Sequence, residues 1–242
     1  MKKVLLKDII IPHIPSPYYH FEYNSDSMVV KANFSDGFTI YDVIYNGNAI
    51  AEMRNNIFVA HDTLRYVYDN AGKVSQIVFI NQANVLYRHV VFSYTGNQVS
   101  KIEWDHQDVA SYLVDRTVTF TYYADGNVKT LADHRPAHNG SAETTINQQF
   151  EGYDDKINVD DFSLIHDGIH DHLFLLQGFR LQRNNPAKEI FSAGAGNTAY
   201  TVNNTYTYNS NGTPATKTGA LLFTDGSDAG KTFQTSTTYT YY

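Results

Sequence analysis

The sequence lacks several residue types and motifs that would point directly to a chemistry. None of its 242 residues is cysteine, which excludes disulfide bonds, thiolate zinc sites and a cysteine nucleophile. No segment approaches the run of roughly 18 apolar residues that a membrane-spanning helix needs. Glycine-rich phosphate loops, nucleophile elbows and dinucleotide fingerprints are also absent. These absences weaken an enzymatic interpretation, and we predict no cofactor, no metal site and no assignable catalytic residue.

Basic side chains are too few to favour a nucleic-acid partner. The chain has 18 Lys and Arg against 25 Asp and Glu, which gives a formal net charge of −7 at pH 7. No basic stripe is present to neutralise phosphates. We therefore expect no nucleic-acid binding.

The first residues resemble the start of a secretory signal but do not continue as one. Lys7 and Asp8 interrupt the apolar run that begins at Val4, and that run is too short for a signal's hydrophobic region. We predict a first strand from Lys3 to Ile11 instead.

A short unit recurs through nearly the whole chain. An alternating segment ends at a tyrosine, a turn rich in Asp, Asn and Gly follows, and a second alternating segment returns, most clearly from Val118 to Leu131. Successive copies lie 22 to 30 residues apart, which indicates a repeat architecture. The turns follow Tyr23, Tyr45, Tyr68, Tyr94, Tyr123, Tyr153, Arg183 and Tyr208.

Each unit has the pattern of an antiparallel hairpin. Gly and Asn tolerate the positive φ angles that tight hairpin turns need. In the flanking segments, such as 117–122, Val, Phe and Tyr alternate with Thr, which predicts strands with one buried aromatic face and one hydroxyl-rich face. Hairpins are predicted at 18–34, 38–54, 62–80, 86–104, 116–131 and 145–159, with further strands in 178–192, 200–223 and 231–242.

These units predict an all-β fold of about sixteen strands within a single domain, residues 1–242. A flat open sheet of that size is unusual, so we expect one strongly curved or closed, barrel-like sheet. The side chains of so large a barrel cannot fill its interior, and water, a ligand or a plug must occupy it. The least strand-like stretch, 160–177, is the candidate plug, as a short helix or packed loop.

Several segments together resemble a known protein family. Tyr68-Asp69-Asn70-Ala71-Gly72-Lys73-Val74 is similar to a YD-type repeat. Two later segments, Tyr153–Asn158 and Asn184–Ile190, follow one another in the order found in secreted bacterial lipoproteins of unknown function with a porin-like β fold. Most of the chain resembles that family.

The resemblance implies export and a periplasmic, outer-membrane-anchored or cell-surface location. It also implies a lipid anchor on an N-terminal cysteine, which would lie outside this sequence. The family brings no established catalytic residues, so none is carried over.

One cluster in the 160–177 stretch could bind a ligand. His166 and His170 would share a helical face, as metal ligands can, and Asp171 and His172 lie beside them. The sequence lacks the Glu that follows the first His in a metalloprotease helix. The alternative is a polar loop or helix face.

Four carboxylates flank the same stretch: Asp154, Asp155, Asp160 and Asp161. They could bind a hard cation or act as an acid–base pair, but no calcium-loop spacing is present. Carboxylates so close in a turn more often cap the backbone and solubilise the chain.

Trp104 and His106 form a second candidate contact for a ligand. An exposed tryptophan beside Asp105 and His106 would suit sugar stacking, whereas a tryptophan on a strand more often belongs to the core.

The leading hypothesis is an exported cell-envelope protein without catalytic activity that binds or scaffolds, holding a glycan or peptide, or a protein partner, on a concave face. The alternative is a polysaccharide hydrolase that uses dispersed carboxylates such as Asp155, Asp161 or Asp171; a purely structural shell is a third reading. A membrane porin would need an apolar outer band with aromatic girdles. The threonine-rich face predicts instead that the barrel does not span a membrane.

Overall fold

A computed structural model describes residues 4–56, 61–108, 111–138, 140–161, 164, 180–193 and 197–242. Within these residues the regular structure is β-strand, without any α-helix, and sixteen strands form one closed barrel. The predicted all-β barrel of about sixteen strands is confirmed. The strands are β1 (Leu6–Ile10), β2 (Tyr19–Tyr23), β3 (Val29–Phe34), β4 (Thr39–Asn46), β5 (Ala49–Asn55), β6 (Thr63–Tyr68), β7 (Val74–Ile80), β8 (Leu86–Thr95), β9 (Gln98–Gln107), β10 (Tyr112–Tyr122), β11 (Val128–Arg135), β12 (Thr144–Tyr153), β13 (Pro186–Ala193), β14 (Asn197–Tyr208), β15 (Pro214–Phe223) and β16 (Thr232–Tyr241).

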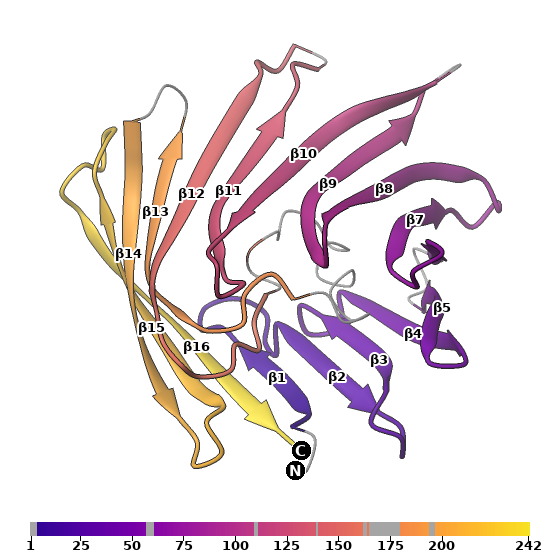
Figure 1. Ribbon diagram of the computed structural model, residues 1–242, viewed down its shortest axis with the longest axis horizontal. Coiled ribbons are helices and arrows are strands. Elements are labelled where there is room, and N and C mark those ends of the chain that lie inside the picture. Colours follow the sequence, from indigo (N-terminus) through magenta and orange to yellow (C-terminus); the bar gives the residue numbers. More distant parts are fainter. Residues whose placement is uncertain are drawn as a thin grey trace.

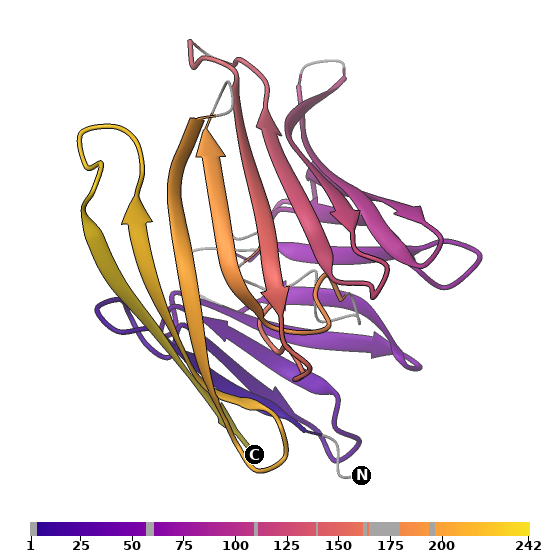
Figure 2. The ribbon, with the colours of Figure 1, turned by 60° about the vertical axis from the view of Figure 1, so that its left-hand side comes forward.

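Every strand pairs antiparallel with its neighbours in the sequence, and β1 closes the barrel on β16. Ile9 lies opposite Tyr239 at this closure, and Asp8 lies opposite Thr240. Both chain ends therefore meet at one rim, at the bottom of Figure 1. We call this the turn rim, because short turns join the strands there, and the opposite end the loop rim. Figure 2 shows the long strands β12–β16 as one side of the barrel, with β1–β4 running across below them.

The alternation in the sequence becomes an inside and an outside of the wall. On β10, Val118 and Phe120 are buried, whereas Thr119 and Thr121 are exposed. The buried hydrophobic side chains of the described part of the chain come from residues 6–131, apart from Phe150, Leu181 and Tyr239. Among the described residues, buried hydrophobic side chains thus pack the interior beside β1–β11 and much less so beside β12–β16.

Side-chain oxygens shape the turns as the Asp and Asn positions predict. Asp69 Oδ1 accepts hydrogen bonds from the main-chain N–H of Ala71 and Lys73, both at 2.9 Å. Between them Gly72 adopts φ of 76°, a backbone conformation that residues other than glycine rarely adopt. The turn is therefore specified locally, before any contact with the rest of the barrel.

The repeated tyrosines have a role that the repeat itself does not show. Each ends an even-numbered strand, and its hydroxyl donates a hydrogen bond to a main-chain carbonyl at the start of the preceding odd-numbered strand. Seven such bonds, 2.7–2.8 Å long, join Tyr23 to Leu6, Tyr45 to Val29, Tyr68 to Ile50, Tyr94 to Val74, Tyr122 to Val99, Tyr153 to Val128 and Tyr241 to Pro214. On β14, Tyr206 makes the equivalent bond to the carbonyl of Pro186 at 3.3 Å. We call these bonds tyrosine brackets.

The brackets alternate with the turns around the turn rim. A covalent turn joins β2 to β3 there, whereas β1 and β2 are joined only at the far end, by the loop after Ile10. The bracket from Tyr23 closes this second seam. In the copy at 118–131 the bracket comes from Tyr122 rather than the Tyr123 that marked the repeat, since Tyr123 begins the turn.

Three sequence-based predictions fail or go untested around residues 154–185. The hairpin turn predicted after Arg183 is wrong, because the described residues 180–185 form no strand before β13. The predicted hairpin at 145–159 is wrong, because β12 pairs with β13 and no strand forms near Ile157. The backbone of Asp154 and Asn158 bonds instead to Asn185 and Arg183, which leaves it unavailable to a strand ladder. Most of the predicted plug at 160–177 lies outside the described residues.

Removing one bracket should destabilise the barrel measurably. Tyr122→Phe deletes the donor to the Val99 carbonyl, so we expect the free energy of unfolding in urea to fall by about 1–2 kcal/mol. Tyr112→Phe is the control, because this ring lies at the other end of β10 and is 39% exposed. Its effect should stay within about 0.5 kcal/mol, and equal losses in the two variants would contradict the bracket's role.

Candidate functional site

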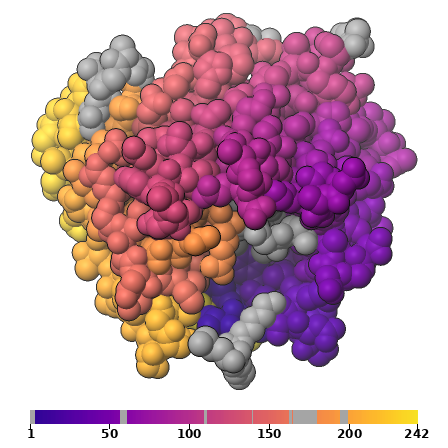
Figure 3. Space-filling view, viewed as in Figure 1, coloured from indigo at the N-terminus to yellow at the C-terminus, as the bar shows by residue number. Residues whose placement is uncertain are grey.

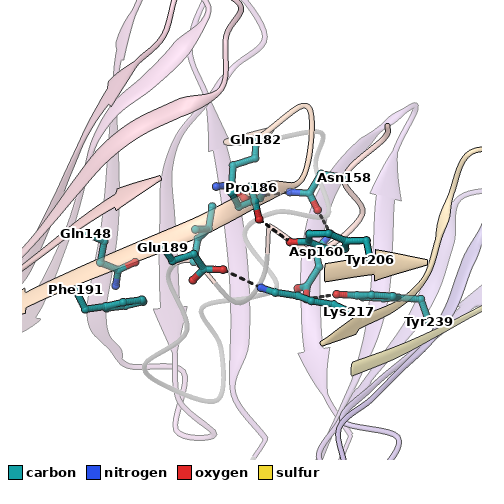
Figure 4. A pocket seen from close by; sticks show the side chains of 11 residues that line it. Gln148, Asn158, Asp160, Gln182, Pro186, Glu189, Phe191, Tyr206, Lys217 and Tyr239 are labelled. Atoms are coloured by element: carbon teal, nitrogen blue, oxygen red, sulfur yellow. Dashed lines mark hydrogen bonds and ion pairs between the residues drawn. The ribbon is translucent and has the colours of Figure 1, made fainter. Parts of the chain in front are cut away.

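The inner wall formed by β12–β16 carries a polar cluster. Glu189 Oε1 of β13 accepts hydrogen bonds from Lys217 Nζ of β15 at 2.9 Å and from Asn204 Nδ2 of β14 at 2.7 Å. The strand register places all three side chains on the inner face, as Figure 4 shows for Glu189 and Lys217. A carboxylate and an ammonium group are thus held partly buried inside the barrel.

A small cavity of about 70 Å³ adjoins this cluster. Asp160 and Tyr239 line it, and the Tyr239 hydroxyl donates to Asp160 at 3.1 Å. Burial raises the pKa of Tyr239 well above its usual value, so this hydroxyl remains a donor at neutral pH. Pockets for small molecules measure roughly 300–1,000 Å³, so this cavity admits only a group about the size of two water molecules.

A row of four aromatic rings lies on the same wall, nearer the loop rim. Phe191, Tyr200 and Phe223 are direct register partners on β13, β14 and β15, and Phe233 of β16 continues the row. Successive ring centroids are 4.2, 5.8 and 5.7 Å apart. Phe233 is 52% exposed although its strand partner Leu221 belongs to the inner face, so the wall is open there. Phe191 also lines the cavity, which makes this aromatic row continuous with the polar cluster.

The two segments that carry the family resemblance lie side by side. Asp154 N donates to Asn185 O at 3.1 Å, and Asn158 N donates to Arg183 O at 3.0 Å. Asn184 Nδ2 adds a bond to Lys156 O at 2.9 Å. We call this contact between residues 154–158 and 183–185 the clasp. It brings together the chain on either side of the 160–182 stretch at the lower end of the inner wall.

Asp161 extends the clasp as a buried carboxylate. It accepts hydrogen bonds from Leu181 N at 2.9 Å, Gln182 N at 3.0 Å and Asn158 Nδ2 at 3.2 Å. Burial raises its pKa to about 7, against the opposing effect of these donors. Its bonds show a structural role, because both carboxylate oxygens are engaged in holding the chain at 181–182.

Trp104 lies inside the packed half of the barrel. It is 3% exposed, and the Arg116 guanidinium lies 4.5 Å from the centre of its ring. Arg116 is fixed in turn by two bonds to the Asp133 carboxylate, at 3.0 and 2.9 Å. The ring is therefore not presented to solvent as a stacking platform.

His106 lies on the inner face of β9 near the loop rim. Its Nδ1 is 2.6 Å from Asp115 Oδ1, and Arg88 reaches the other oxygen of Asp115 at 3.2 Å. The His138 ring lies 5.5 Å away, centre to centre. This group is separate in the sequence and on the wall from the polar cluster of β13–β15.

The remaining predicted ligands, His166, His170, Asp171 and His172, lie outside the described residues. Elsewhere in the described chain no group of three or more His, Asp or Glu side chains is arranged to hold a metal ion. The described residues also contain no helix long and apolar enough to cross a membrane.

The carboxylates considered for hydrolysis are not gathered in one cleft. Asp155 is 86% exposed and pairs with Lys156 at 2.8 Å, whereas Asp161 is buried in the clasp. Asp171 lies outside the described residues. The two carboxylates that do share a cavity are Asp160 and Glu189, and both already accept hydrogen bonds from neighbouring side chains.

Comparison with known proteins supports the fold. A porin-like protein from Bacteroides vulgatus superposes with a TM-score of 0.65 at 15% sequence identity, over 98% of each chain. A porin-like protein from Bacteroides uniformis superposes with a TM-score of 0.64 at 14% identity, over 93% of this chain and 89% of that one. The chain matches no protein-family model and none of the curated proteins. At these identities the likeness concerns the porin-like β-barrel fold alone.

The sequence analysis missed the residues of the inner wall. Glu189 and Lys217 stand 28 positions apart on alternating strands, so only the register brings them together. The rings of the aromatic row follow the same alternation as rings that are buried elsewhere. Their exposure depends on how much of the barrel interior is filled, which a periodic pattern does not report.

The buried Asp161 should make stability depend on pH. Its pKa rises from 3.8 to about 7 on folding, so between about pH 4 and 7 the native state keeps a proton that the unfolded chain has lost. The free energy of unfolding should therefore fall as pH rises through this window. Asp161→Asn should lower the free energy of unfolding by about 1–3 kcal/mol near pH 4, because the side-chain NH₂ of the asparagine would face a main-chain N–H donor at Leu181 or Gln182. The variant should also lose this part of the pH dependence.

Urea unfolding at intervals from pH 4 to 8 measures both effects. Asp155→Asn provides the control, because that side chain is exposed, and it should follow the wild-type profile between pH 5 and 7. Parallel profiles for the wild type and Asp161→Asn would show that Asp161 does not titrate in this range.

Proposed function

We propose that this protein is an exported, envelope-associated binding barrel without catalytic activity, which holds a glycan or peptide on the inner wall of β12–β16. The observation that carries the proposal is the aromatic row, partly exposed and continuous with the Glu189–Lys217 pair on one concave surface. Contiguous exposed apolar surface beside a few fixed polar groups is typical of binding sites. On the inner faces of β7 and β8 comparable rings, those of Phe79 and Phe92, are buried.

The outer face supports a barrel that stands in water. Threonines such as Thr119 and Thr121 are exposed there, and Glu52 pairs with Arg54 at 2.8 Å and with Arg65 at 3.0 Å across the outside of β5 and β6. Charged side chains on a lipid-facing wall would be costly. Export and a lipid anchor rest on the family resemblance, with which the porin-like fold agrees.

One observation favours the rival, a polysaccharide hydrolase: Asp160 and Glu189 line the same cavity. Glycosidases use two carboxyl groups about 5–10 Å apart. The cavity is too small for a sugar ring, and Lys217 and Tyr239 already engage the two carboxylates. Binding without cleavage is therefore the better supported function.

A thermal-shift screen against soluble glycans and peptides tests the proposal, with each glycan afterwards analysed for cleavage. A ligand at about 100 times its Kd should raise Tm by about 5–10 °C and remain intact. Lys217→Gln should at least halve that shift. Lys101→Gln should not, because Lys101 makes a similar pair with Glu103, 3.1 Å long, on the outer face.

A shortened glycan would establish the hydrolase in place of the binding barrel. A shift that both lysine variants reduce equally would move the site away from the inner wall. The absence of any shift across the panel would favour a purely structural shell.

A further inference from the structure

The rings of the aromatic row stand in a particular orientation. Phe191 and Tyr200, on adjacent strands, are stacked with their centroids 4.2 Å apart and their planes within 19°. Adjacent strands are about 4.8 Å apart, so two rings stacked across them stand upright on the sheet and cover each other's faces. Phe223 and Phe233 meet nearly perpendicular, at 87°, so the edge of one ring contacts the face of the other. The stacked pair therefore presents ring edges to the barrel interior.

This orientation discriminates between ligand classes. A sugar stacks on the flat face of an aromatic ring, and the flat faces of the stacked pair point along the sheet and not into the barrel. The ring edges of the stacked pair, with the tilted rings beyond them, form an apolar, corrugated surface that suits a flexible alkyl chain. The row crosses four strands, hence three strand spacings or ~14 Å, which is the length of an extended chain of about ten carbons.

The polar end of the wall selects the head group. Among the described side chains that line the cavity, Asp160 and Glu189 are acidic and only Lys217 is basic. Lys217 is already paired with Glu189 at 2.9 Å, so an anionic head group would meet an excess of negative charge. A hydroxyl group can donate to either carboxylate without that penalty, and the cavity of about 70 Å³ admits a group of that size.

We infer that the inner wall binds an uncharged amphiphile, with its alkyl chain across the aromatic row and one hydroxyl of its head group in the cavity at Asp160 and Glu189, the rest of the head group lying outside the cavity. This inference rests on the proposed function, since it assumes that the wall is a binding surface, and it assigns an amphiphile as the ligand in place of a glycan or peptide. Because Phe191 belongs to the aromatic row and also lines the cavity, the head group would lie next to this ring.

Isothermal titration with three probes tests the inference: decyl maltoside below its micelle concentration, maltose, and decanoate. Decyl maltoside should bind, whereas maltose and decanoate should bind at least tenfold more weakly. Each methylene buried against the row should strengthen binding about fourfold, so octyl maltoside should bind about 15-fold more weakly than the decyl compound.

Two matched variants test where the alkyl chain of the ligand binds. Phe233→Thr removes an exposed ring from the inner face of β16 and should weaken decyl maltoside binding about tenfold. Leu222→Thr removes a side chain 39% exposed, next in sequence to inner-face Phe223 and therefore on the outer face, and should leave binding unchanged. Equal losses in both variants would place the amphiphile elsewhere and overturn the inference.

The outcomes also separate this inference from the proposed function. Maltose binding as tightly as decyl maltoside, with sensitivity to Lys217→Gln, would keep the inner wall as a glycan site and overturn the alkyl-chain assignment. Decanoate binding as tightly as decyl maltoside would overturn the head-group assignment. If none of the probes and no ligand of the glycan and peptide panel binds, both proposals fall together.

Discussion

A hydrogen bond from a tyrosine hydroxyl to a main-chain carbonyl recurs around one rim of this barrel, and it joins the strand pairs that no turn connects there. Short turns join alternate pairs of strands at the turn rim, and the tyrosine brackets join the pairs between them. The exceptions are β12 and β13, which residues 154–185 connect, and β16 and β1, where the chain begins and ends. Each bracket contributes about 1 kcal/mol, but together they fix the register of every hairpin against the one before it. Burial raises the pKa of Tyr68 and of Tyr241 to about 12, so both hydroxyls remain donors in alkaline solution as well.

A sixteen-stranded barrel encloses more space than the side chains of its strands fill. In the described part of this chain, the large buried side chains are concentrated on one part of the wall. Large side chains such as Tyr41, Phe79 and Trp104 pack the interior beside β1–β11. Beside β12–β16 the described inward positions carry Asn204, Lys217 and partly exposed rings, apart from the buried Phe150 and Tyr239. Figure 3 shows a recess on one outer face, between the orange and magenta segments and the indigo strands below them. The unfilled wall is what makes a binding function physically reasonable for a fold that otherwise shows only packing.

Much of the fold could be predicted from the sequence, because hairpins are local. The Asp69–Gly72 turn and the alternation at 117–122 specify turn and strand within a few residues, and sixteen strands of that kind exceed what an open sheet accommodates. The clasp could not be predicted, because in the sequence Asp154 has the pattern of a turn residue and its contact with Asn185 forms only in the folded barrel. The inner wall was missed for the same reason: Glu189 and Lys217 meet only through the register of three strands. Predictions that concern 162–163 and 165–179 remain predictions.

The central claim is that the barrel is packed on one side and open on the inner wall of β13–β16. The absence of cysteine allows a direct measurement, because a single introduced thiol can be labelled in each of three variants: Phe233→Cys on the open wall, Leu222→Cys on the outer face and Val118→Cys in the packed interior. With a small thiol reagent, Phe233→Cys should react within about tenfold of the rate of Leu222→Cys, whereas Val118→Cys should react at least ~10²-fold more slowly, through unfolding. If Phe233→Cys is as protected as Val118→Cys, the inner wall is closed and the account of its function fails.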